Sequence, residues 1–324
     1  MRLKHHYYFH IYKMNNTAPI ILFVYNRLTH TQRVIEALKE NSLAKDSELY
    51  IYADAAKDAK ARHKVDQLRS YLPSITGFKN VYIHLRDTNL GVDENTIQGV
   101  TEVVNLHGRV IVLEDDLVTS PWFLKFMNEG LDFYENEHDV ASIHGYVYPV
   151  RQKMKEVFFI KGADCWGWAT WKRAWDLFEP DGAKLLDKIV AEGLQQEFDF
   201  DNTYAYVEAL KRQATGKTTE WDIRWYASAF LAGKLTLYPG QSLVTNIGHD
   251  ASGVHCGEST SYEVAMAQSA LCVKTDIKPD PEAYIAFADF FTQLALDRTP
   301  RPKGLLSRSF RKLKTFIREA VISK

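Results

Sequence analysis

Cysteine is scarce in this 324-residue sequence, which has only Cys165, Cys256 and Cys272, an odd number without paired spacing. A disulfide scaffold or a cysteine-based zinc site is therefore not expected, and a reducing compartment fits. No stretch approaches the roughly 18 uninterrupted apolar residues that a transmembrane helix needs. The first segment, MRLKHHYYFHIYKM, lacks the apolar core and cleavage site of a signal peptide. We expect residues 1–16 to be a leader of uncertain order.

An excess of one charge sign is also missing, because 40 Lys and Arg face 41 Asp and Glu for a net charge of −1. This balance argues against a globally basic nucleic-acid-binding protein. Hydrophobic residues make up 46% and charged residues 25% of the chain. These fractions are ordinary for a folded protein and exclude a disordered, collagen-like or coiled-coil chain.

Short apolar runs alternate with segments of helical periodicity over residues 17–140. We predict strands at 18–25, 48–53, 79–85 and 109–113, a helix capped by Thr29 or Thr31, and helices at 61–72, 92–106 and 121–136. The first run, APIILFVY, is continuously apolar, as in a strand buried on both faces of a parallel sheet. The order predicts an α/β fold: a mostly parallel central sheet with helices on both faces and a Rossmann-like first half. Ligands bind such sheets beyond the carboxyl ends of the strands.

The second half is less regular. We predict strands at 140–144, 157–161 and 235–239, a long helical run over 183–231, and a peripheral helical segment over 257–300. The expected boundaries are 17–140 and 141–256 for two halves of one catalytic domain, followed by 257–300 and a tail at 301–324.

The tail, residues 301–324, has its own composition, with eight Lys and Arg against the single acid Glu319. Its apolar residues recur at helical spacing, at positions 306, 310, 313, 317 and 321. A basic amphipathic helix of this kind is typical of a peripheral anchor on an anionic membrane. A terminal helix that docks on its own domain explains the same pattern, and both interpretations stay open.

Three successive carboxylates, Glu114, Asp115 and Asp116, end the predicted strand at 109–113. Adjacent negative charges repel one another unless a positive charge lies beside them. Mg²⁺ and Mn²⁺ prefer oxygen ligands and keep open positions for phosphate. We therefore predict a divalent cation here, and His249 in the segment NIGHD is a candidate to complete its shell, ahead of His255.

Two other strand ends carry polar residues. Arg27 closes the first strand and suits a base, ribose or phosphate, although a surface ion pair explains it equally well. Asp54 closes the second strand and suits a nucleobase N–H, although Asp is also common in turns.

Four tryptophans fall within the eleven residues from Cys165 to Trp175. Trp171 and Trp175 are four apart and are expected in the core. Trp166 and Trp168 flank Gly167 in an expected loop, where their rings suit the C–H face of a sugar.

A second acidic site is expected in the segment EWDIRW, residues 220–225. Asp222 lies beside two tryptophans, an environment that raises a carboxyl pKa and suits a general base. A helix cap is the alternative role for Asp222.

Together the segments PIILFVYNRLTHTQRVIEAL, VIVLEDDLVTSPWFLKFMN, CWGWATWKRAW and LYPGQSLVTNIGHD resemble bacterial glycosyltransferases with the A-type nucleotide-sugar-binding fold. More specifically, the chain resembles the branch akin to N-acetylglucosaminyltransferase I. The similarity covers roughly residues 17–256, with the motifs in one continuous order along the chain. The chain departs from that branch at WDIRW, where the relatives have WDDW. The Gly often found after the second strand is also missing at Ala55–Lys57.

The resemblance implies inverting transfer from a nucleoside-diphosphate sugar, usually uridine-linked, to a glycan or lipid-linked acceptor. It implies that Arg27 and Asp54 hold the uracil, that Glu114 and Asp115 lie near the ribose and sugar, and that Asp116 ligates Mn²⁺ or Mg²⁺. It places Asp222 as the base, and because this chain has WDIRW in place of WDDW, Glu220 is the alternative base. Such an enzyme is expected in the cytoplasm or on the inner face of a bacterial plasma membrane, in surface polysaccharide synthesis.

Three other functions stay in view. A sugar nucleotidyltransferase has a similar sheet but needs a Gly-rich phosphate loop, which residues 26–30 (NRLTH) do not supply. A glycoside hydrolase uses two carboxylates without a nucleotide. A non-catalytic carbohydrate-binding protein would use the tryptophans and gain nothing from three packed acids.

Overall fold

The structure is a computed structural model and describes residues 17–250 and 259–298. The leader 1–16, the tail 301–324 and His255 lie outside the described residues. The strands are β1 (Ile20–Val24), β2 (Glu48–Ala53), β3 (Asn80–Leu85), β4 (Arg109–Glu114), β5 (Leu117–Thr119), β6 (Val140–His144), β7 (Val157–Lys161), β8 (Trp168–Trp171), β9 (Leu235–Pro239) and β10 (Val244–Asn246).

Helices join most of these strands, and two of them are very short. They are α1 (Leu28–Lys39), α2 (Ala59–Tyr71), α3 (Gly91–His107), α4 (Phe123–Phe133), α5 (Lys172–Trp175), α6 (Gly182–Ala191), α7 (Gln195–Phe198), α8 (Tyr206–Ala214), α9 (Trp221–Leu231) and α10 (Pro281–Arg298). Short 3₁₀ helices lie at Ala44–Asp46 and Leu72–Ser74.

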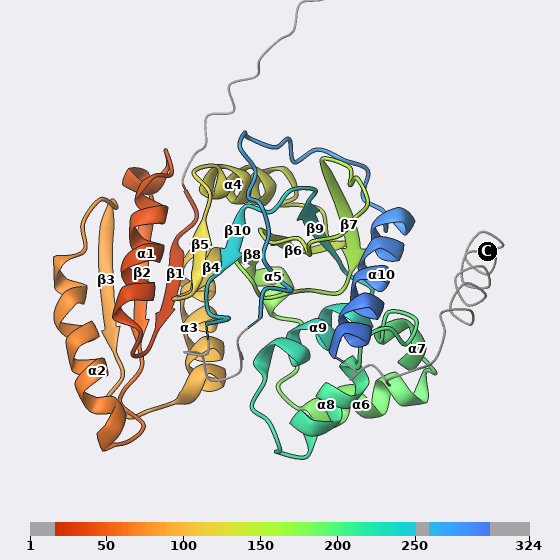
Figure 1. The fold of residues 1–324 in the computed structure, drawn as a ribbon, viewed down its shortest axis with the longest axis horizontal. Helices are drawn as coiled ribbons and strands as arrows, with labels where there is room; N and C mark the ends of the chain where they lie inside the picture. Colours follow the sequence, from red (N-terminus) through yellow and green to blue (C-terminus); the bar gives the residue numbers. More distant parts are fainter. Residues whose placement is uncertain (1–16, 251–258, 299–324) are drawn as a thin grey trace, which may run out of the picture.

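The described strands form an eight-stranded sheet in the order β3-β2-β1-β4-β8-β6-β9-β7, with β5 and β10 paired in a separate ribbon (Figure 1). Strands β1 to β4 are mutually parallel. Strands β8 and β7 run antiparallel to their neighbours. The α/β fold class is confirmed. Because β1 lies between β2 and β4, the order of connection reverses there, and such switch points are where ligands bind.

Strand β1 is buried on both faces, as its continuous apolar run predicts. Ile20, Leu22 and Val24 belong to one buried cluster, together with side chains of α1, α2 and α4. Ile21 and Phe23 belong to a second cluster, with side chains of α3, α5 and α9. Alternate residues therefore face opposite helical layers, and each fully buried aliphatic side chain stabilises the fold by about 1.5–3 kcal/mol.

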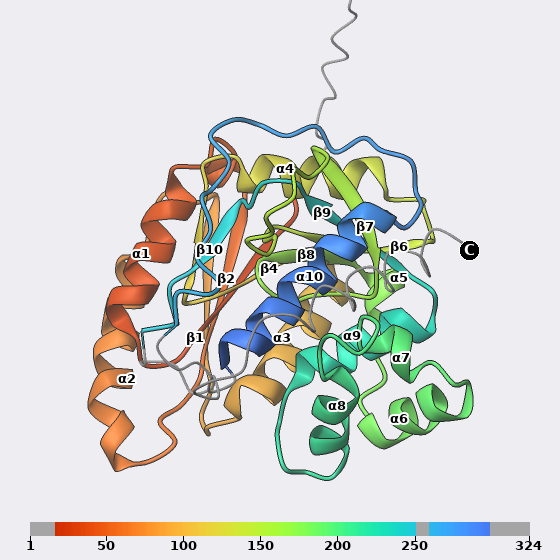
Figure 2. The same cartoon turned by 45° about the vertical axis from the view of Figure 1, so that its right-hand side comes forward.

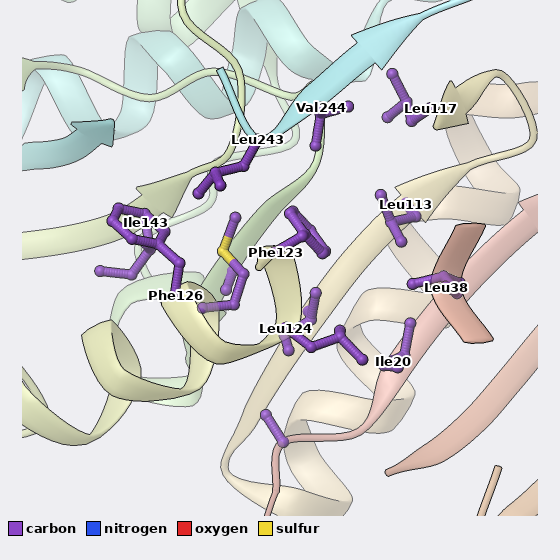
Figure 3. Close-up of a cluster of buried hydrophobic side chains, with 14 of the residues drawn as sticks. Ile20, Leu38, Leu113, Leu117, Phe123, Leu124, Phe126, Ile143, Leu243 and Val244 are labelled. Carbon is purple, nitrogen blue, oxygen red and sulfur yellow. The ribbon is translucent and has the colours of Figure 1, made fainter. Parts of the chain in front are cut away.

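The first cluster also fixes the ribbon of β5 and β10 beside the end of β4. Figure 3 shows side chains of α4 meeting those of β1, β4, β6 and the ribbon; the labelled residues are Ile20, Leu38, Leu113, Leu117, Phe123, Leu124, Phe126, Ile143, Leu243 and Val244. The turn between β4 and β5, which carries the acidic run, is thus held by apolar packing on both of its sides.

Three local predictions are wrong. The helical run at 183–231 is divided among α6, α7, α8 and α9, because positive-φ residues such as Gly193 and Gly216 break it. The segment 257–300 is helical over α10 alone among its described residues, and α10 is not peripheral, because it packs beside β7 in a third buried cluster (Figures 1 and 2). Helix α1 begins at Leu28, and the Thr31 hydroxyl donates to the carbonyl of Arg27 from inside the helix at 3.1 Å.

Candidate active site

The acidic run lies where β4 ends. Glu114 is the last residue of β4 and is paired with Phe23 of β1, so Arg27, four residues farther along, reaches the same edge. The Arg27 guanidinium donates to Asp116 at 2.9 Å and also to Asp115. Burial alone would lower the pKa of Arg27, but the charges of Asp115 and Asp116 outweigh it and raise that pKa. Arg27 therefore stays positively charged and is the counterion of the two aspartates in this turn.

One guanidinium does not balance all the acids at this edge. Burial raises the pKa of Glu114 to about 8, and the charges of Asp116, Asp115 and Asp222 add to the rise. Burial also raises the pKa of Asp115, against the attraction of Arg27. Asp115 Oδ2 is buried without a hydrogen-bond partner among the residues the structure describes. The site thus retains buried oxygen ligands and an excess of negative charge.

These oxygens suit a metal that takes most of its ligands from substrate. In residues 17–250 and 259–298, no three His, Cys, Asp or Glu side chains are grouped to hold a metal by themselves. Mg²⁺ commonly binds through one or two carboxylates and completes its shell with water and substrate phosphates. Asp115 and Asp116 fit that arrangement.

The segment after β10 lies directly against Asp116. The amide of Ile247 donates to the Asp116 carbonyl at 2.8 Å, and a Cβ on Gly248 would come within 2.2 Å of Asp116 Oδ2. The neighbouring His249 stacks on Tyr262, with ring centroids 5.0 Å apart, and contacts Trp166 at 5.5 Å. His249 thus follows the segment that contacts Asp116, and its ring packs against Tyr262 and Trp166.

Asp54 lies at the carboxyl end of β2, as predicted, yet its carboxylate is surrounded by donors from the chain itself. It accepts hydrogen bonds from the amides of Leu90 and Gly91 and from the Asn89 side chain, each at 2.9 Å, and from the amide of Ala55 at 2.8 Å. Asp54 therefore shapes the loop that enters α3.

Asp222 lies in the first turn of α9, directly after Trp221, and Glu220 precedes the helix. The Cys165 thiol contacts Asp222 Oδ2 at 3.7 Å. Burial raises the pKa of Asp222 to about 6, with a further contribution from the charge of Glu220. The charge of Asp222 also contributes to the raised pKa of Glu114. The two acidic segments, which are far apart in the sequence, are therefore near enough in the fold for their charges to interact.

The two candidate sugar-stacking tryptophans lie in different environments. Trp168 is fully buried in β8, packed on Trp221 and Trp225 with centroids 5.6 and 5.7 Å away, and has no exposed ring face for a sugar. The predicted contact of Trp168 with a sugar is therefore wrong, because its ring is enclosed by the core. Trp166 is partly buried, and its backbone amide donates to His144 Nε2 at 3.0 Å. Trp171 and Trp175 are buried, as expected.

A cavity of about 540 Å³ is lined in part by Asp222 and Glu220. The sequence did not predict this cavity. It also did not single out Asp164, which lines the cavity together with Asp222. The available signal was the position of Asp164 directly before the CWGW motif. The other lining residues are Ala163, Asp199, Asn202, Thr203, Tyr204, Ala205, Tyr206, Ala209, Arg212, Ile223, Tyr226, Phe291, Leu294 and Ala295.

Comparison with known proteins gives no assignment from sequence: no protein-family model and no curated protein matches this chain. Among solved structures, it is similar to a mannosyltransferase from Pyrobaculum calidifontis in complex with GDP-Man and Mn²⁺, with 10% identity and a TM-score of 0.29. It is also similar to S. aureus TarS, with 14% identity and a TM-score of 0.34. A third similar structure is a putative nucleotide-diphospho-sugar transferase from Desulfovibrio desulfuricans G20, with 12% identity and a TM-score of 0.33.

These similarities are partial. The alignments cover 41%, 47% and 51% of this chain and 35%, 28% and 68% of the respective solved chains. The matched part thus spans about a third of the mannosyltransferase and less than a third of TarS. At these values, the similarity assigns no role to individual residues of this chain.

Proposed function

We propose that this protein is a glycosyltransferase that moves a sugar from a nucleoside-diphosphate donor to an acceptor hydroxyl. One observation carries the proposal: Arg27, Asp115 and Asp116 meet at the switch point of the sheet, and the charge of Asp222 reaches Glu114 at the same edge. This arrangement supplies a cationic group and a metal-binding pair for a diphosphate, with a carboxylate base next to them.

On the donor side, Arg27 is the residue proposed to bind a phosphate oxygen. A guanidinium presents several N–H donors in one plane, which suits paired phosphate oxygens. Asp115 and Asp116 are proposed to hold Mn²⁺ or Mg²⁺, a metal that supplies positive charge where the leaving diphosphate develops negative charge. The loop that Asp54 orders, at the start of α3, is proposed to contact the base and ribose, and Glu114 the donor sugar.

On the acceptor side, Asp222 is proposed to take the proton of the attacking hydroxyl on its carboxylate oxygen. A pKa of about 6 keeps it mainly ionised at neutral pH while leaving it basic enough to accept a proton. The Trp166 ring, packed on Tyr146 at 4.8 Å, is proposed to exclude water, because hydrolysis of the donor competes with transfer. Glu220, which also lines the cavity, is the alternative base.

The finer assignment is also a proposal. We propose a uridine-linked donor, inversion at the anomeric carbon, and a glycan or lipid-linked acceptor in bacterial surface polysaccharide synthesis at the inner face of the plasma membrane. The basic tail is proposed as the membrane contact. Among the described residues, no helix is long and apolar enough to cross a membrane.

Thermal unfolding with a panel of nucleotides and nucleotide sugars, each with Mn²⁺ and with EDTA, tests the proposal. A ligand that binds only the folded state raises the melting temperature as its concentration exceeds its Kd. We expect a metal-dependent shift with one nucleoside diphosphate and its sugars. A shift with glycans alone, unchanged by EDTA, would instead identify a carbohydrate-binding protein.

A further inference from the structure

The cavity beside Asp222 is formed by segments that are far apart in the sequence. Its walls come from the loop at Ala163 and Asp164, the segment 199–205, helix α8, the start of α9 and helix α10. Figures 1 and 2 show α8, α9 and α10 on the same side of the sheet. Its volume of about 540 Å³ lies within the usual range of small-molecule sites.

Aromatic rings make one continuous wall of this cavity. The Tyr206 ring lies 4.4 Å from that of Tyr204 and 4.6 Å from that of Tyr226, between centroids. The Phe291 ring of α10 lies 4.8 Å from that of Tyr204 and extends the same surface. Aromatic faces of this kind offer an apolar platform with polar hydroxyl groups at its edge.

Carboxylates make up much of the remaining polar surface, and two of them are held in fixed positions. Asp164 accepts a hydrogen bond from the Tyr148 hydroxyl at 3.0 Å, and Asp199 accepts one from the amide of Val207 at 2.7 Å. Such oxygens accept hydrogen bonds from the hydroxyl groups of a ligand.

The charge of the cavity sets which ligands it admits. Among the described lining residues, the carboxylates of Asp164, Asp199, Glu220 and Asp222 face the single guanidinium of Arg212. A lining with this balance repels a carboxylate- or phosphate-bearing ligand, whereas a neutral polyol meets no such repulsion and finds hydrogen-bond acceptors for its hydroxyl groups.

We propose that this cavity binds the acceptor, and that the acceptor is a neutral saccharide whose ring packs on the Tyr204–Tyr206–Tyr226 wall. The inference rests on the proposed transferase function, because it is Asp222 that joins the cavity to the donor side. A hydroxyl of a sugar bound there lies next to the proposed base, and the aromatic wall orients the ring that carries it.

Two tryptophan variants of the intact chain test the site. Ala205 is exposed, lines the cavity and precedes α8, so A205W fills the cavity from its rim without altering the core. Lys211 is exposed in the same helix and does not line the cavity, so K211W is the matched control. Binding is measured by saturation-transfer NMR with maltotriose, mannotriose and N,N′,N″-triacetylchitotriose, and with trigalacturonic acid as the anionic probe.

We expect at least one neutral trisaccharide to bind the wild type and K211W equally, and to bind A205W about tenfold more weakly or not at all. Trigalacturonic acid is expected to bind more weakly than the neutral probe. Preference for trigalacturonic acid, absence of binding by all three neutral probes, or equal binding to A205W would each overturn the proposal.

Thermal shifts with nucleotides are recorded on the same three proteins to separate the two proposals. If all three proteins bind a nucleotide and none binds a saccharide, the proposed acceptor site is rejected and the proposed transferase function stands. Saccharide binding that A205W removes, without any nucleotide shift, supports a neutral saccharide site and rejects the transferase.

Discussion

Arg224 in α9 forms a buried ion pair with Asp93 in the first turn of α3, so the helix that carries Asp222 is tied to the first, parallel half of the fold. The Arg224 guanidinium also donates to the carbonyl of Pro180 at 2.9 Å. Arg224 stands two residues after Asp222, and the side chain of Arg224 is only 7% exposed. This pair therefore fixes where α9 begins relative to the acids of β4.

Removing the charge of Arg224 is expected to destabilise the fold strongly. R224M leaves Asp93 without its cation in a site where burial already raises the pKa of Asp93. Loss of one partner of a buried pair costs about 3 kcal/mol or more. Urea unfolding of R224M measures this, and K172M, which removes an exposed pair with Asp176, is expected to change stability by less than about 1 kcal/mol. Equal effects of the two changes would contradict the structural role of Arg224.

Asp222 is expected to act on the chemical step and not on donor binding. D222N removes the basic oxygen and is expected to lower kcat by about 10²- to 10⁴-fold while nucleotide affinity stays nearly constant. Steady-state kinetics and nucleotide titrations measure the two effects. E220Q is the paired variant, and a larger loss of kcat in E220Q than in D222N would move the base to Glu220.

The pH dependence of kcat follows from the pKa of Asp222, about 6. A general base works when it is deprotonated, so activity is expected to rise with pH through about 6 and then level off. One pH unit below the pKa, about a tenth of the groups are ionised, and the rate falls in proportion. The titratable groups that interact with this carboxylate are Glu220, Asp164 and Cys165. Because the charge of Glu220 contributes to the raised pKa of Asp222, E220Q is expected to shift the midpoint of the profile to lower pH. A profile flat from pH 5 to 8 would exclude Asp222 as the base.

Asp54 is expected to act through the loop that it organises. D54A removes the acceptor for the amides of Leu90 and Gly91 and is expected to cost about 2–4 kcal/mol, since hydrogen bonds to charged groups are worth more than neutral ones. Hydrogen exchange at the Leu90 amide measures the local loosening. The control D58A removes only the N-cap of α2 and is expected to lower the free energy of unfolding by about 1 kcal/mol. The Leu90 amide is expected to stay protected from exchange in D58A. Protection of Leu90 in D54A as in the wild type would contradict this role.

The strands that position the site were predictable because they are buried on both faces. A run such as residues 18–25 has no solvated side, so its residues are continuously apolar and the strand is easy to identify from the sequence. The acidic turn at Glu114 and the strand-end positions of Arg27 and Asp54 follow from the same pattern. The pairing of Arg27 with Asp115 and Asp116 was not predictable, because it depends on which strands become neighbours.

The second half depends on contacts between distant segments, which one sequence does not specify. Trp168 was expected in a loop, but it belongs to a strand inserted antiparallel between β4 and β6, where its ring is enclosed by α9. The cavity joins the loop at Asp164 to Phe291 of α10. The partners of Asp54 come from the loop after β3, more than 30 residues along the chain.

The release of nucleoside diphosphate from a panel of nucleotide sugars, with Mn²⁺ and a mixture of saccharide acceptors, tests the transferase proposal most directly. We expect the wild type to consume one donor, and we expect EDTA to stop the reaction. D116N removes a charged oxygen beside Arg27 and is expected to reduce turnover by about 10²-fold or more, with an unchanged circular dichroism spectrum. A wild type that consumes no donor with any acceptor, or a fully active D116N, would contradict the assignment of this site.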